Sequence, residues 1–101
     1  MAALIIVNYD VVDAEGLAGY RALAGPILRS RFGAVGVVGT SDTIDLQEGP
    51  GAGTHTVVLQ FDTVEAAREA WFSEEYQQVL PLRMAAITPK SAILVETVAP
   101  A

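Results

Sequence analysis

Two spacings of hydrophobic residues divide the chain into predicted strands and helices. Runs rich in β-branched and aromatic residues, without helical spacing, are typical of strands. They occupy residues 4–12, 34–38, 41–48, 55–61 and 92–98. The two middle runs form either a strand with a hairpin arm or one long strand bent around Gly39. The first run is apolar throughout, which indicates burial on both faces.

Apolar residues recur at spacings of three and four in two other stretches, which is the period of a helix with one buried face. The first stretch follows Asp13, a residue that can cap a helix, and it ends at Gly33. Pro26 lies inside this stretch and removes one backbone hydrogen bond, so we expect a bend there.

The second helical stretch covers residues 62–87. Asp62 and Glu65 have the spacing of a capping box, and Ser73 begins a second helical segment. We expect Pro81 to interrupt that segment, and residues 88–90 to turn the chain into the last strand.

The resulting order of elements is the βαββαβ pattern of a ferredoxin-like α+β fold. One antiparallel sheet would carry two helices on one face, in a single domain over residues 1–101. Two helices cover only one side of such a sheet, but the strands look apolar on both sides. A second copy packed sheet to sheet would cover the other side, so we expect a homodimer. The apolar content of 51% favours the same conclusion.

Composition excludes several kinds of partner and site. Twelve acidic residues against six scattered basic ones give a net charge of −6, so no nucleic acid is expected as a partner. The absence of cysteine excludes disulfides, thiolate catalysis and Cys-based metal sites. The N-terminal run lacks the basic start of a signal peptide, and no run is long enough to span a membrane. We therefore expect a cytoplasmic protein without a membrane partner.

Several short motifs together cover nearly the whole chain. The most specific is Ser73-Glu74-Glu75-Tyr76-Gln77, followed by Leu82-Arg83. The others are Tyr20, Phe32-Gly33, Gly39, Glu48, residues 57–61, Glu65-Ala66-Ala67-Arg68 and Leu94-Val95-Glu96. In these motifs the chain resembles the family called domain of unknown function 1330. The resemblance implies the dimeric α/β-barrel superfamily, in which two ferredoxin-like subunits pack their sheets into a shared barrel.

That superfamily includes cofactor-free monooxygenases, muconolactone-type isomerases, polyketide cyclases and haem enzymes, so its fold does not determine function. The chain departs from the family pattern in three places. Gly33-Ala34 stands where Gly-Gly is expected, and Glu96-Thr97 replaces a Glu-Gly ending. His55 stands where an arginine is expected to open the central strand.

His55 is the only histidine, and histidine is the side chain that titrates near neutrality without perturbation. It begins a strand beside the Gly-rich loop 49–53, where it could act as a general acid or base. The alternative is an exposed residue at a strand end. No nucleophile elbow, metal-ligand spacing or phosphate-binding loop accompanies it, so we expect neither a metal nor a cofactor.

Polar residues on three predicted strands form a second candidate group. Asn8, Gln60 and Glu96 lie on strands that neighbour one another in a ferredoxin-like sheet, so they converge if the register allows. Such a patch could bind the carbonyl, hydroxyl or amide of a small ligand. Alternatively, these residues lie at strand ends or in the dimer seam.

Four aromatic residues occupy helix positions that can face the sheet: Tyr20, Trp71, Phe72 and Tyr76. Aromatic residues at helical spacing usually belong to the core. The family resemblance implies that they could instead line a substrate cavity, because relatives often hold substrates between the helices and the sheet.

Arg83 lies on the apolar side of its predicted helix. It forms either an ion pair with Glu75 or Glu96, or a clamp for the carboxylate or enolate of a substrate.

These residues lead to a hypothesis of a dimeric protein that binds a small, mostly apolar organic molecule between helices and sheet. The chemistry would be cofactor-independent isomerisation or cyclisation of a polyketide-like or aromatic substrate. The catalytic residues would be His55 as the proton carrier, with Asn8 and Tyr20 as donors to an oxyanion. The binding residues would be Arg83, Trp71, Tyr76, Gln60 and Glu96. One alternative is a ligand-binding or stress-associated protein without turnover, and another is a dimer whose core is filled by Trp71, Tyr76 and Met84.

Overall fold

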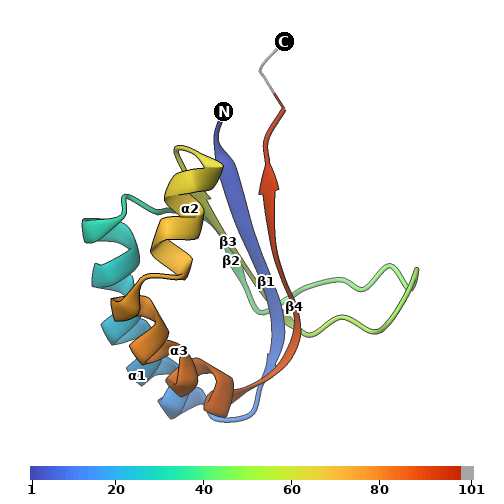
Figure 1. The fold of residues 1–101 in the computed structure, drawn as a ribbon. Coiled ribbons are helices and arrows are strands. Elements are labelled where there is room, and N and C mark those ends of the chain that lie inside the picture. The colour runs from blue at the N-terminus through green and yellow to red at the C-terminus, as the bar shows by residue number, and fades with distance from the viewer. Residues whose placement is uncertain (99–101) are drawn as a thin grey trace.

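A four-stranded antiparallel sheet and one layer of helices make up the computed structural model, which describes residues 1–98 (Figure 1). The last three residues of the predicted domain, 99–101, lie outside the described residues. The elements are β1 (Ala3–Val11), α1 (Ala14–Gly25), η1 (Pro26–Arg31), β2 (Val35–Thr40), β3 (His55–Phe61), α2 (Val64–Trp71), α3 (Glu74–Ala86) and β4 (Ile87–Glu96). The strand order β2-β3-β1-β4 is ferredoxin-like, which confirms the predicted fold class.

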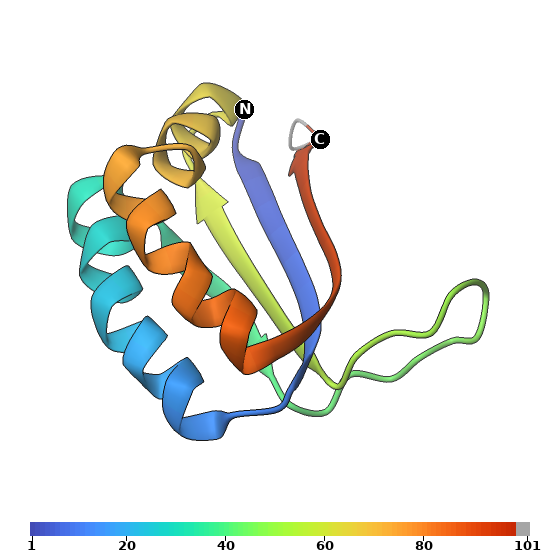
Figure 2. The same cartoon turned by 60° about the horizontal axis from the view of Figure 1, so that its bottom comes forward.

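The helices cover one face of the sheet, and the core lies between the two layers (Figure 2). Every second residue of β1 points toward the helices, and Ile5, Val7 and Tyr9 are each at most 4% exposed. The helices contribute Leu17, Ala67 and other small or apolar side chains to the same core. This alternation follows from the two-residue period of a strand.

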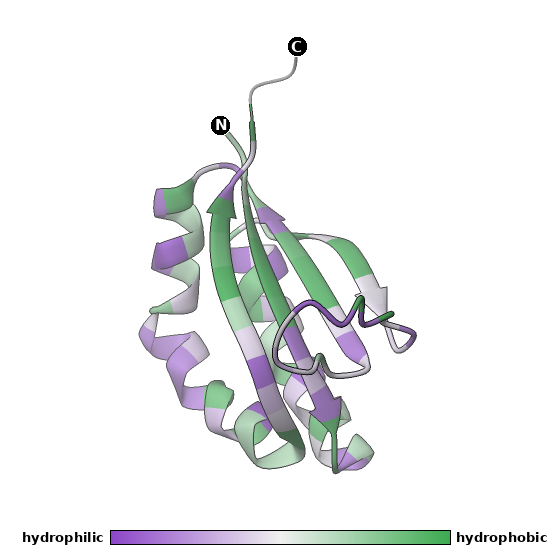
Figure 3. Cartoon of the chain, turned by 90° about the vertical axis from the view of Figure 1, so that its right-hand side faces the viewer, coloured by the Kyte–Doolittle hydropathy of each residue, from purple (hydrophilic) through white to green (hydrophobic). Residues whose placement is uncertain are grey.

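The face of the sheet that points away from the helices is also apolar, as the sequence predicts. Figure 3 views this face: the upper parts of the strands are hydrophobic in colour, and their lower parts, near the long loop, are mostly hydrophilic or pale. Ile6 of β1 pairs with Val58 of β3 and Ile93 of β4 across it. Ile93 is 51% exposed and Val38 of β2 is 42% exposed.

Side-chain caps determine where the helices begin. The predicted caps Asp13 and Ser73 are confirmed, because each accepts a hydrogen bond from the backbone N–H three residues on, at 3.0 and 3.2 Å. The capping box predicted at Asp62 is wrong. Thr63 caps α2 instead, with its hydroxyl 3.0 Å from the N–H of Ala66. The helix therefore starts one residue later than predicted.

The bend predicted at Pro26 takes the form of a wider turn. Residues Pro26–Arg31 form the π-helical segment η1, which continues directly from α1. Proline lacks the N–H that would continue the α-helical ladder, which is consistent with a change of turn at this point. Gly33 then adopts φ = 73°, a left-handed conformation that glycine accommodates, and the N–H of Ala34 reaches the carbonyl of Leu28 at 2.9 Å.

Residues 41–48 form no strand, contrary to prediction. They belong to a loop, residues 41–54, that projects away from the sheet (Figures 1 and 2). The carboxylate of Asp45 accepts hydrogen bonds from the N–H groups of Gln47 and Ala52, at 2.7 and 3.0 Å. These bonds lower the pKa of Asp45. Local bonds of this kind compete with a sheet ladder.

Two predicted interruptions near the C-terminus are also wrong. Helix α3 continues through Pro81, and β4 begins at Ile87 instead of residue 92. Residues 88–90 are part of the strand, because the register with β1 shifts so that Asn8 faces Ser91 and Tyr9 faces Pro89. An edge strand with an irregular register tolerates a proline, which cannot donate to the ladder.

Candidate functional site

A pocket of about 690 Å³ lies between the helices and the sheet. Its walls are α1 and η1 on one side and β1, β2 and β3 on the other, with Trp71 and Arg83 completing it. Val7, Val57 and Leu59 provide an apolar floor. The alternative of a fully filled core is therefore wrong, since Trp71 borders the space and Met84 is 44% exposed.

The pocket lining is positive although the chain is acidic. Arg21, Arg29 and Arg83 line it, and no aspartate or glutamate does. The two ion pairs formed within residues 1–98 lie elsewhere: Arg31 with Glu75, and Lys90 with Asp10. In the part of the chain that the structure describes, half of the six basic residues therefore line one pocket without a carboxylate partner, which is the electrostatic arrangement of an anion site.

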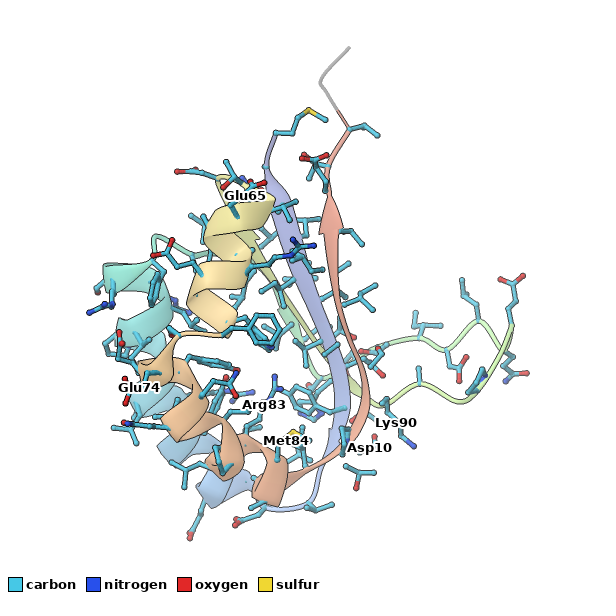
Figure 4. All side chains as sticks on the ribbon, in the orientation of Figure 1. Asp10, Glu65, Glu74, Arg83, Met84 and Lys90 are labelled. Carbon is cyan, nitrogen blue, oxygen red and sulfur yellow. The ribbon has the colours of Figure 1, made fainter. Side chains whose placement is uncertain are left out.

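Arg83 lies between α3 and the sheet (Figure 4) and is 6% exposed. Its guanidinium carbon is 5.2 Å from the ring centroid of Trp71 and 5.9 Å from that of Tyr20. Within residues 1–98 it makes no ion pair or hydrogen bond, and its buried Nε atom has no partner. The expected pair with Glu75 or Glu96 is not formed. A buried cation of this kind is costly unless an anion compensates it, although the two rings offset part of the cost.

Tyr20 and Tyr76 form a hydrogen-bonded pair beside Arg83. Their hydroxyl oxygens are 2.7 Å apart and their rings meet edge to face. Burial raises the pKa of Tyr20, and burial together with the neighbouring Tyr20 raises the pKa of Tyr76, so both hydroxyls stay protonated at neutral pH. Tyr20 lines the pocket, while Tyr76 is fully buried behind it. When Tyr76 donates to Tyr20, the Tyr20 proton is free to meet a ligand.

His55 also lines the pocket, as the first residue of β3. Its ring stacks on Tyr9 of β1, with centroids 5.7 Å apart and an interplanar angle of 12°. Its Nδ1 atom lies 2.9 Å from the hydroxyl of Thr54. Nε2 is therefore the ring nitrogen left for a ligand, and the Thr54 contact and the stacking hold the ring in place.

Trp71 is the last of the predicted site residues that line this pocket, after Arg83, Tyr20 and His55. It borders the pocket, and its ring lies 4.5 Å from that of Tyr76. Phe72, which was expected to face the sheet, is 73% exposed because α2 ends at Trp71 and Phe72 falls outside the helical stripe.

Asn8 does not reach this pocket. Its side chain accepts a hydrogen bond from the N–H of Gly53 at 2.7 Å. Its amide nitrogen lies 3.1 Å from the Gly53 carbonyl, 3.0 Å from the His55 carbonyl and 3.1 Å from the Thr56 hydroxyl. The amide is therefore occupied in fastening the end of the long loop to β1, next to the backbone of His55.

The predicted patch of Asn8, Gln60 and Glu96 is not formed. Asn8 pairs with Thr56 in the sheet, whereas Gln60 pairs with Leu4, four residues away along β1. At about 3.4 Å per residue this separates the two by more than 10 Å. Glu96 lies opposite Ala3 and belongs to the other face of the sheet.

Sequence reasoning missed Tyr9, Arg21 and Arg29 as pocket residues. Arg21 and Arg29 each follow a buried residue of the first helical stretch, Tyr20 and Leu28, so they flank its buried stripe. That adjacency is visible in the sequence. The π-turn that carries Arg29 toward β2 is not.

Within residues 1–98, no helix is long and apolar enough to cross a membrane, and no group of three or more His, Asp or Glu side chains is arranged to hold a metal ion.

Solved structures with the same fold include three useful neighbours. A protein of unknown function from Rhodopseudomonas palustris is 19% identical with a TM-score of 0.76, over 98% of this chain and 84% of that one. A dimeric ferredoxin-like protein of unknown function from Bacteroides fragilis is 11% identical with a TM-score of 0.55, over 95% and 96%. A provisionally named antibiotic biosynthesis monooxygenase from Chloroflexus aurantiacus is 11% identical with a TM-score of 0.58, over 100% and 97%.

These likenesses show the fold and not the activity, since all three identities are low. No curated protein matches the chain. The model of one protein family, described as "Domain of unknown function (DUF1330)", matches residues 2–98. Because this match spans nearly the whole chain, the protein belongs to the DUF1330 family.

Proposed function

We propose that this protein binds a small, mostly apolar organic anion in the pocket between helices and sheet and isomerises or cyclises it without a cofactor. The observation that carries the proposal is Arg83. A cation that is 6% exposed, has no ion-pair partner within residues 1–98 and borders a pocket without carboxylates is suited to an acidic ligand group. Trp71 and the apolar floor favour an aromatic or polyketide-like body.

The proposed chemistry is proton transfer next to a carbonyl group. His55 accepts a proton from the carbon beside the carbonyl through Nε2, and the electron pair moves onto the carbonyl oxygen. Tyr20, backed by the hydroxyl of Tyr76, donates a hydrogen bond to that oxygen. Return of the proton to the far carbon of a conjugated double bond gives an isomer. Alternatively, the enolate carbon attacks a second carbonyl of the same molecule and closes a ring, and the alkoxide formed from that carbonyl takes the proton back from His55.

Asn8 has a different role in this proposal from the one expected from the sequence. Its hydrogen bonds to Gly53 and His55 make it a positioning residue that fixes the loop end and the start of β3. Tyr20 remains as the oxyanion donor.

Binding can be followed through Trp71, because it is the only tryptophan and borders the pocket. We expect 2-naphthoate to quench its fluorescence saturably. Replacing Arg83 by Gln should weaken binding about tenfold or more, since a charge-assisted bond is lost. Arg68→Gln is the matched control, because Arg68 is exposed and lies outside the pocket lining. Equal losses in both variants would argue against a specific role for Arg83.

Proton transfer is tested with 4-oxo-4-phenylbutanoate, which joins an aryl ketone to a carboxylate. In D₂O, NMR should show protein-dependent exchange of the protons beside the ketone. His55→Gln should abolish the exchange and leave binding in place. Saturable binding without any exchange would favour the alternative, a binding protein without turnover.

We also propose that the protein is a homodimer formed through the outer face of the sheet. This face exposes Val38, Ile93 and Val95, each at least 37% exposed, and the neighbour from Bacteroides fragilis is described as dimeric. Sedimentation at micromolar concentration should give a dimer, and Ile93→Asp should give a folded monomer. Val12→Asp, at an exposed residue just after β1, should leave the dimer intact. A cytoplasmic location stays a prediction from the sequence.

A further inference from the structure

The arginines that line the pocket occupy different depths. Arg83 is buried against Trp71 and Tyr20, whereas Arg21 and Arg29 are exposed residues of α1 and η1. All three lie outside the ion pairs formed within residues 1–98. The pocket therefore has one inner cation and a separate pair at its outer part.

Arg29 reaches across the pocket to the edge strand. A Cβ atom built on Gly36 of β2 would lie 4.0 Å from the Nη2 atom of Arg29. Gly36 and Gly39 both line the pocket, and a Cβ on Gly39 would meet nothing within 4 Å. The Arg29 guanidinium therefore lies beside Gly36, and the space next to Gly39 is open to a group of a ligand.

Apart from the arginines, much of the pocket lining is apolar. Leu28, Val57 and Leu59 belong to this apolar part, and within residues 1–98 no Asp or Glu side chain lines the pocket to pair with the arginines. A ligand with an apolar skeleton and a single acidic group would form an ion pair with Arg83 and leave Arg21 and Arg29 without a partner from the ligand. A second acidic group on the same molecule would use them.

We infer that the natural ligand is an elongated dianion, an apolar or aromatic body with one acidic group bound by Arg83 and a second bound by Arg29 and Arg21. This inference rests on the proposed function and narrows its substrate class. It predicts that affinity depends on the outer arginines only when the ligand carries the second acidic group.

The test compares matched acids by isothermal titration calorimetry at low ionic strength. The pairs are 2-naphthoate with naphthalene-2,6-dicarboxylate, and biphenyl-4-carboxylate with biphenyl-4,4′-dicarboxylate. At least one diacid should bind about fivefold or more tightly than its mono-acid, the gain of a partly exposed ion pair. The double variant Arg21→Gln/Arg29→Gln should remove this gain and keep the affinity for the mono-acid.

Arg68→Gln serves as the charge control and should preserve the gain. The inference is overturned if neither diacid binds more tightly than its mono-acid, or if the gain persists in the double variant. If the mono-acids bind and the diacids do not, the proposed function stands and the inference of a dianionic ligand is rejected. If neither mono-acids nor diacids bind, the proposed function itself is rejected.

Discussion

The hydroxyl groups of Tyr20 and Tyr76 lie 2.7 Å apart in the interior, where α1 and α3 face each other. Tyr20 is 8% exposed and Tyr76 is fully buried. Neither hydroxyl ionises easily there, because burial disfavours the phenolate. The pair therefore keeps a proton available to the pocket over the whole neutral range.

The first prediction concerns the ionisation of these two residues. Burial raises the pKa of both above the ordinary value of 10.0, so they should titrate late in an ultraviolet titration of the folded protein. Tyr20→Phe and Tyr76→Phe should each remove a late component. If a variant instead loses the component that titrates near pH 10, the residue it lacks is not shielded.

The same shifts predict how stability depends on pH in alkaline solution. The folded pKa lies above the unfolded value of 10.0, so the stabilisation is complete below pH 10 and is lost as the pH rises above it. With two such groups, the free energy of unfolding should fall by up to about 2.7 kcal/mol per pH unit. Urea unfolding between pH 9 and 11 measures this slope, which should become smaller in Tyr76→Phe.

A second set of contacts makes Asn8 important for stability. Asn8→Ala would leave the N–H and carbonyl groups of Gly53 without their partner, at a cost of about 1–3 kcal/mol. Gln60→Ala is the control, since Gln60 is an exposed residue of β3 on the same face of the sheet. Thermal unfolding of the two variants should differ, and a loss in Gln60→Ala as large as in Asn8→Ala would contradict the role of these bonds.

Gly53 has no room for a side chain. A Cβ atom there would collide with the backbone of Tyr9 and Asp10, so Gly53→Ala should force the loop away from β1. We expect a loss of about 1–3 kcal/mol, typical of overpacking, and faster hydrogen exchange at residues 53–56. Gly51→Ala is the matched control, because its Cβ would make only ordinary contact with Asp45. Similar stability of the two variants would show that the loop can move away from β1 without lowering the free energy of unfolding.

Local patterns predicted much of this fold and only part of the site. Strand β3 has the predicted bounds, because a run of β-branched and apolar residues ends at a Gly-rich segment on one side and a helix cap on the other. Residues 41–48 resemble a strand in composition, but Asp45 bonds locally. Such bonds are invisible to a pattern of apolar residues.

The site required information from distant parts of the chain. Arg83 could be singled out because a charge stands on an apolar helix face, and His55 because it is the only histidine. The role of Asn8 depends on the register between β1 and β3 and on contacts 45 residues away. The position of Arg29 in the pocket lining depends on the π-helical turn that begins at Pro26. No local pattern contains either relationship.

The central claim is that the buried Arg83 binds an acidic ligand and does not stabilise the ligand-free protein. Arg83→Met removes the charge and keeps an apolar side chain against Trp71 and Tyr20. Loss of an uncompensated buried cation should leave the melting temperature of the ligand-free protein unchanged or higher.

The deciding measurement is a calorimetric titration of 2-naphthoate into wild type and Arg83→Met, with the melting temperature of each ligand-free protein recorded alongside. The account predicts a loss of affinity of about tenfold or more in the variant, without a loss of thermal stability. Unchanged affinity together with a lower melting temperature would contradict it, because Arg83 would then be a structural residue.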